Sequence, residues 1–192
     1  ELKSLALKSL SKREVGGRPF TVYLGLNKNA KVLGLKKAIY LLYETLDSDF
    51  EFTKMKQENE NMIATVWNNI NPNCSPTGTT IISLTTPYFD DCFGSFLNVD
   101  NYDKLLSNIT NKLIGNFEDV SGCHISEFIE EVEVKTPVDT ATLSELPDGS
   151  TYGYRYVSYD NLIPRILNRK NENYIDRLYF CGGFDGDIYG IE

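Results

Sequence analysis

Apolar and polar positions follow a strand-like pattern in four short segments of the first ninety residues. These segments are rich in β-branched and aromatic side chains, which are typical of strands that are buried on at least one face. A loop rich in Pro, Asn and Gly, residues 71–78, separates the last two of them. We therefore predict four strands, at Pro19–Asn27, Ala38–Glu44, Asn61–Ile70 and Thr79–Thr86.

The clearest helical pattern lies at Val99–Phe117, where either Asp100 or Asn101 is expected to be the N-cap. Apolar residues recur there at a helical spacing, and Lys, Asn and Ser occupy the other side. The residues expected on the apolar side are Tyr102, Leu105, Leu106, Ile109, Leu113 and Phe117.

Shorter elements are expected after this helix. Ile125–Lys135 predicts a helical turn, capped by Ser126, that leads into a strand. Thr136 should be extended because Pro137 follows it, Pro147–Gly149 should form a tight turn, and Leu178–Cys181 should be a last strand. Strands without regular βαβ alternation indicate an α+β fold, with a mixed, largely antiparallel sheet covered by helices.

Composition narrows the classes of function. The chain of 192 residues has a net charge of −8, which disfavours binding to nucleic acid and to anionic membrane surfaces. No apolar run approaches the roughly 20 residues of a membrane span. The four cysteines include no C-x-x-C pair and are consistent with free thiols in the cytoplasm.

Familiar catalytic and metal-binding patterns are weak in this sequence. His124, the one histidine, directly follows Cys123, and neighbours on an extended chain point to opposite sides, so we predict a surface or helix-cap histidine and not a catalytic pair. Asp47–Glu58 has acidic spacing similar to that of a calcium loop, but Phe52 stands where the loop needs glycine, so we predict a solvated acidic edge.

Several short motifs occur in an order that resembles one enzyme family. They are TVYLGLN at Thr21–Asn27, NPNCSPTGTTIISLTT at Asn71–Thr86, the helix from Tyr102, VKTPVDTATLSELPDGSTYGY at Val134–Tyr154, and DRLYFCGGFDGDIYG at Asp176–Gly190. In this order they resemble the C-terminal half of the phytoene desaturase, carotenoid isomerase and retinol saturase family of FAD-dependent oxidoreductases. That family opens with a G-x-G-x-x-G segment that holds the flavin, and no such segment opens this chain.

The resemblance implies a fragment with two parts. Residues 1–175 would be a substrate-binding domain, and residues 176–192 would return toward a missing N-terminal FAD-binding domain. Gly182, Gly183 and Gly186 would approach the cofactor, whereas Thr136, Pro137 and Gly149 would set the shape of the backbone. FAD would bind in the full-length parent, with none expected in this fragment, and any apolar patch exposed by loss of the flavin half would lie near Gly149–Tyr154.

Aromatic side chains could contact the substrate. Tyr152 and Tyr154 are the proposed substrate-binding residues, although aromatic residues serve equally well in an ordinary core. The implied function is the substrate-binding part of an oxidoreductase that acts on C–C bonds of an apolar, isoprenoid-like substrate. The alternative is a free-standing, non-catalytic module that binds a lipid or a partner protein.

Overall fold

The computed structural model describes residues 15–47, 50–51, 61–89, 102–145, 149–151 and 153. The chain divides into two compact units, Pro19–Gly149 and a second unit made of Glu1–Arg18 with Ser150–Glu192. In the second unit, the backbone N–H of Gly16 donates a hydrogen bond of 2.6 Å to the carbonyl of Gly153. The first unit, Pro19–Gly149, contains the sheet and the described helices.

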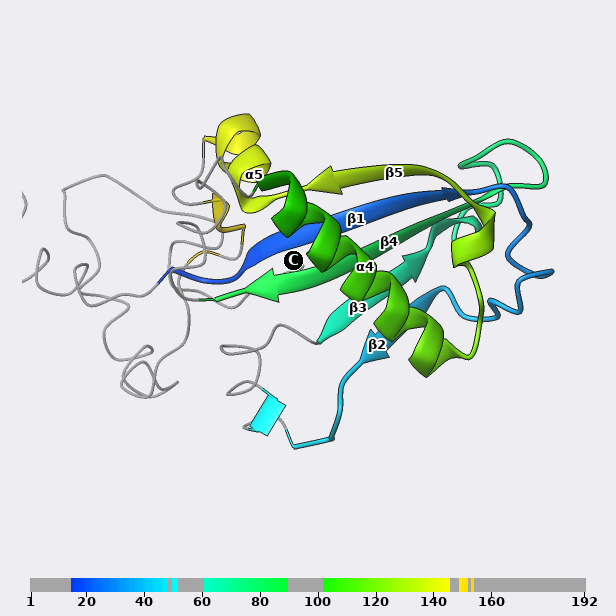
Figure 1. Ribbon diagram of the computed structural model, residues 1–192, viewed down its shortest axis with the longest axis horizontal. Helices are drawn as coiled ribbons and strands as arrows, with labels where there is room; N and C mark the ends of the chain where they lie inside the picture. The colour runs from blue at the N-terminus through cyan, green and yellow to red at the C-terminus, as the bar shows by residue number, and fades with distance from the viewer. Residues whose placement is uncertain are drawn as a thin grey trace, which may run out of the picture. The chain divides into compact units, whose positions relative to one another are not determined.

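A five-stranded antiparallel sheet forms the centre of this unit, in the order β2-β3-β4-β1-β5 (Figure 1). The strands β2, β3 and β4 form a meander, and β1 lies between β4 and β5. The bounds of the strands are β1 Arg18–Leu26, β2 Ile39–Leu42, β3 Met62–Val66, β4 Thr80–Tyr88 and β5 Ile129–Lys135.

One long helix covers one face of the sheet. Helix α4 (Tyr102–Ser121) runs across the strands in Figure 1, and a second helix, α5 (Pro137–Ser144), follows directly after β5. Two 3₁₀ turns complete the described elements, η1 (Trp67–Asn69) after β3 and η3 (Ser126–Phe128) before β5.

The core lies between α4 and the sheet face beneath it. Alternate residues of each strand point to this side because a strand has a side-chain period of two. The ring of Phe117 on α4 meets the ring of Tyr40 on β2 edge to face, with 5.6 Å between ring centroids. The most deeply buried side chains here are Phe20, Val22, Leu24, Leu26, Met62, Ala64, Val66, Ile82, Leu84, Leu113 and Phe117.

Most of the predicted elements are confirmed. The α+β class, the four early strands, the helix and the strand before Lys135 are all present. The third strand ends at Val66, because Trp67–Asn69 turns away as η1. The predicted caps Asp100 and Asn101, the strand Leu178–Cys181 and the boundary at residue 176 lie outside the described residues.

Two predictions of detail fail, and one helix was not predicted. Glu51, which was predicted to belong to a solvated acidic edge, is buried, with 4% of its surface exposed. Ser126 is not the cap of its turn, because Ile125 occupies the cap position and its own side chain makes no capping hydrogen bond. Instead, the backbone N–H groups of Ile125 and Ser126 donate to Oε1 of Glu118, over 2.6 and 2.8 Å. Helix α5 was not predicted, although Thr136 does have the extended conformation that was expected, with ψ at 167°.

Candidate functional site

The second face of the sheet, opposite α4, has a mixed character, and we call it the open face. Its side chains come from the alternate positions that do not enter the core. They are Pro19, Thr21, Tyr23, Ile39, Leu41, Ile63, Thr65, Ser83, Thr85, Glu133 and Lys135. A sheet face exposed only to water would be expected to be mainly polar, so the apolar members need explanation.

A strip of small hydroxyl side chains runs across the middle of the open face. The Thr21 and Thr85 hydroxyl oxygens lie 3.0 Å apart on β1 and β4, and Thr65 on β3 is the cross-strand partner of Ser83 on β4. The indole N–H of Trp67 donates to the Ser83 hydroxyl over 3.0 Å. Thr21 and Ser83 are buried, with 9% and 5% of their surface exposed, so the strip belongs to the packed middle of the sheet and its hydroxyls are satisfied within the protein.

Larger apolar side chains lie beside this strip. Leu41 and Ile63 are directly paired across β2 and β3, and Ile39 is paired with Thr65. The side chains of Ile39, Leu41 and Ile63 are 55%, 61% and 39% exposed. Adjacent exposed aliphatic side chains on one sheet face make this part of the surface a candidate contact site for an apolar ligand or partner.

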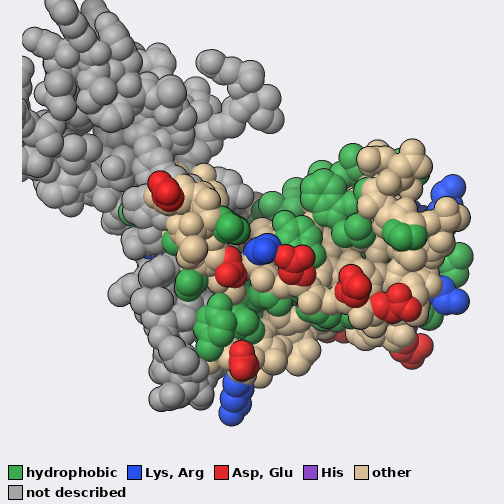
Figure 2. Space-filling model, turned by 90° about the horizontal axis from the view of Figure 1, so that it is seen from above, with side chains coloured by type: hydrophobic (Ala, Val, Ile, Leu, Met, Phe, Trp, Pro, Cys, Tyr) green, Lys and Arg blue, Asp and Glu red, His purple; other side chains and the backbone are tan. Residues whose placement is uncertain are grey.

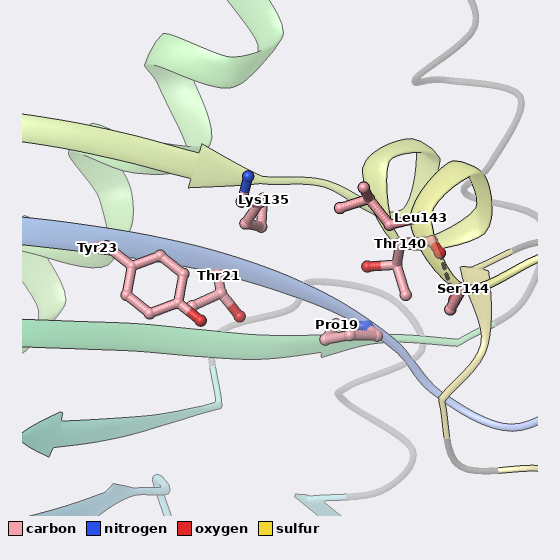
Figure 3. A pocket seen from close by; sticks show the side chains of 7 residues that line it. All are labelled: Pro19, Thr21, Tyr23, Lys135, Thr140, Leu143 and Ser144. Carbon is pink, nitrogen blue, oxygen red and sulfur yellow. Dashed lines mark hydrogen bonds between the residues drawn. The ribbon is translucent and has the colours of Figure 1, made fainter.

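A hollow of about 310 Å³ lies at the end of the open face, between β1, β5 and α5 (Figure 3). Pro19, Tyr23 and Leu143 give it apolar walls, and it also contains several hydroxyls and one cation. Its volume is at the lower end of the range of small-molecule sites, roughly 300–1,000 Å³. Among the residues that the structure describes, the lining is Pro19, Thr21, Tyr23, Lys135, Thr140, Leu143 and Ser144.

Helix α5 forms one wall of this hollow, and local sequence fixes where the helix begins. The Thr136 hydroxyl accepts from the Asp139 N–H over 3.2 Å, and the Asp139 carboxylate accepts from the Thr136 N–H over 2.8 Å. Pro137 occupies the first turn, where its missing N–H has no cost. Gly149 has a φ of 69° and packs so closely that a Cβ there would lie 2.0 Å from the Pro137 carbonyl oxygen. Thr136, Pro137 and Gly149 therefore set the backbone shape beside the hollow.

The charge at the hollow comes from Lys135. Its Nζ lies 2.8 Å from Oε1 of Glu133, and this ion pair is largely exposed. The hydrogen bond and charge of Glu133 raise the pKa of Lys135, so the side chain remains protonated. A nucleophilic lysine requires the opposite shift, so Lys135 can donate hydrogen bonds but is not suited to forming an imine.

The side chains of Cys123 and His124 do not form a pair. Cys123 is buried in the core, whereas His124 is exposed, in agreement with the surface histidine that was predicted. Within the described part of the chain, no three His, Cys, Asp or Glu side chains gather as a metal site. No described helix has the length and apolar character that crossing a bilayer requires.

The described residues that line the hollow are ones for which no site role was predicted. Tyr152 and Tyr154, predicted to contact substrate, and Gly182, Gly183 and Gly186, predicted to approach the cofactor, all lie outside the described residues. The residues of the hollow were missed because each is an ordinary strand or helix residue in sequence. The available signal was the run from Thr136 to Asp139, which predicts a helix start next to the end of a strand.

Two comparisons with known proteins gave no match. No family model matches the chain, and no curated protein sequence matches it. The case for function therefore depends on the motifs of the sequence and on the geometry of the open face.

Proposed function

We propose that this chain is the substrate-binding part of an FAD-dependent oxidoreductase that acts on C–C bonds of an apolar, isoprenoid-like substrate. The observation that carries the proposal is the open face, on which exposed aliphatic side chains and a hydroxyl strip lie on the opposite side of the sheet from α4. The order of motifs from Thr21 to Gly190 supports the same family.

In the proposed enzyme, the flavin would carry out the redox chemistry. When bound, FAD supplies the acceptor or donor of a hydride. The residues of this chain would bind the apolar substrate along Ile39, Leu41 and Ile63, orient it, and exclude water from it.

The first test uses Trp67, the only tryptophan, as a reporter on the open face. The polyene retinol absorbs where tryptophan emits, so binding near Trp67 should quench its fluorescence in a saturable way. Replacement of Ile63 by Ser should weaken this binding severalfold, since it removes apolar contact area. Val120→Ser is the matched control, because Val120 is 69% exposed on α4, across the sheet from the open face. Equal effects of both variants, or no saturable quenching, would contradict the proposal.

A second function has a specific observation in its favour. The exposed pair Leu41 and Ile63 would equally suit a non-catalytic module that binds a lipid or a partner protein. Sequencing the gene upstream of Glu1 separates the two. An upstream G-x-G-x-x-G unit, with flavin absorbance bands in the longer protein, would support the oxidoreductase. A native start at Glu1 together with retained retinol binding would favour the module.

A further inference from the structure

The hydrogen-bonding groups at the hollow are arranged so that they select the polar end of a ligand. On α5, the Thr140 hydroxyl donates to the Thr136 carbonyl over 3.1 Å, and the Ser144 hydroxyl donates to the Thr140 carbonyl. Figure 3 shows the second of these bonds as a dashed line. A hydroxyl has one proton and two lone pairs, so both oxygens have used their protons and can only accept from a ligand.

The opposite wall provides donors. The Lys135 ammonium has three N–H groups and contacts Glu133 through its Nζ at 2.8 Å. Since the ammonium remains protonated, it can also donate to a ligand at the rim of the hollow. One wall therefore accepts hydrogen bonds and the other donates them.

The surrounding charge disfavours an anionic ligand. Glu133 pairs with Lys135, and Asp139 is close enough to act on the same ammonium group. Figure 2 shows acidic side chains spread across this side of the molecule. In addition, Ser144 is the last residue of α5, and the C-terminal end of a helix carries partial negative charge. A cationic ligand is also disfavoured, because the ammonium group of Lys135 would repel it.

From these contacts we infer that the hollow binds the neutral hydroxyl group of an otherwise apolar ligand. The hydroxyl donates to Thr140 on α5 and accepts from Lys135 on β5, while the apolar part contacts Pro19 and Leu143. The inference deepens the proposed function and rests on it, because the apolar part of the ligand is taken to continue along the open face.

The test compares four ligands that share one alkyl chain and differ at one end. Octanol both donates and accepts, octyl methyl ether only accepts, octanoate is anionic and octylammonium is cationic. Isothermal titration calorimetry with the full chain should show octanol binding tightest, roughly three- to tenfold tighter than the ether, which is the range for one neutral hydrogen bond. Tighter binding of octanoate or octylammonium would overturn the inference.

Variants of α5 provide a matched pair. Thr140→Val should lower the affinity for octanol by roughly three- to tenfold and leave the affinity for the ether unchanged. Thr142→Val is the control, because Thr142 makes the same type of bond, to the Val138 carbonyl over 2.9 Å, but does not line the hollow. Equal effects of the two variants would overturn the inference.

The outcomes also separate this inference from the proposed function. If octanol and the ether bind equally well and retinol still quenches Trp67, the preference for a hydroxyl is wrong and the apolar site stands. If none of the four ligands binds and retinol does not quench the fluorescence of Trp67, both the inferred hydroxyl site and the proposed function are wrong.

Discussion

The close packing of Gly149 against Pro137 gives the sharpest prediction for stability. A Cβ at Gly149 would lie 2.0 Å from the Pro137 carbonyl oxygen and 2.8 Å from the carbonyl carbon, where real Cβ atoms almost never come within 3.0 Å. The left-handed φ of 69° costs a non-glycine residue about 1–2 kcal/mol. Overpacking adds about 1–3 kcal/mol. We therefore expect Gly149→Ala to lower the free energy of unfolding by about 2–5 kcal/mol.

Urea unfolding followed by Trp67 fluorescence measures this loss, because Trp67 belongs to the same compact unit. Gly78→Ala is the matched control, since Gly78 has a φ of 90° but nothing within 4 Å of a Cβ. Gly78→Ala should lower the free energy of unfolding only by the cost of the left-handed backbone conformation, about 1–2 kcal/mol. If the two variants lose the same stability, Gly149 does not pack against Pro137, and the account of how α5 is held beside the hollow is wrong.

Three further predictions concern α4 and α5. The Thr136→Ala variant should lose about 1 kcal/mol of unfolding free energy, because it removes the N-cap of α5, whereas Thr142→Ala should lose less; a thermal melt of each variant measures the difference. The Phe117→Ala variant should lose about 3–5 kcal/mol, because the ring is fully buried against Tyr40 and the variant leaves a cavity; a loss below 1 kcal/mol would contradict the packing of α4. Burial raises the pKa of Glu118, but hydrogen bonds from the Ser126 and Ile125 N–H groups outweigh it and lower the pKa overall. Because the folded-state pKa lies below the unfolded one, the stability that the carboxylate contributes is present above about pH 4.3 and is lost as the pH falls below it. Glu118→Gln should therefore make unfolding free energy less dependent on pH in that acidic range, and an unchanged slope would count against these bonds.

Local sequence predicted the strands well because each one combines β-branched residues with a buried face. Phe20, Val22 and Leu24 alternate with Thr21 and Tyr23, and this period identifies a strand and its two faces. The period does not identify which strands are neighbours in the sheet. The position of β1 between β4 and β5 depends on contacts between residues far apart in the chain, such as Thr21 with Thr85.

Helix α5 was missed for a different reason. It has only eight residues and two threonines, so it shows no long apolar stripe. Its start is instead fixed by the reciprocal bonds between Thr136 and Asp139, which involve two residues three apart and are easily read as a turn. The hollow was missed with it, since Thr140, Leu143 and Ser144 reach the open face only once the helix is known.

The two outer strands of the sheet differ in a way that bears on function. On β5, Glu130, Glu131 and Glu133 are exposed, and charge on an outer strand opposes edge-to-edge association of sheets. On β2, the exposed residues are the aliphatic Ile39 and Leu41, whose exposure to water is unfavourable unless something apolar covers them. Charge thus marks the side of the sheet where the hollow would receive a small polar group, and aliphatic surface marks the side where a longer apolar chain would lie. A ligand with one hydroxyl end and an extended apolar body satisfies both sides at once, whereas a purely apolar partner protein on β2 would leave the arrangement of donors and acceptors around the hollow unexplained.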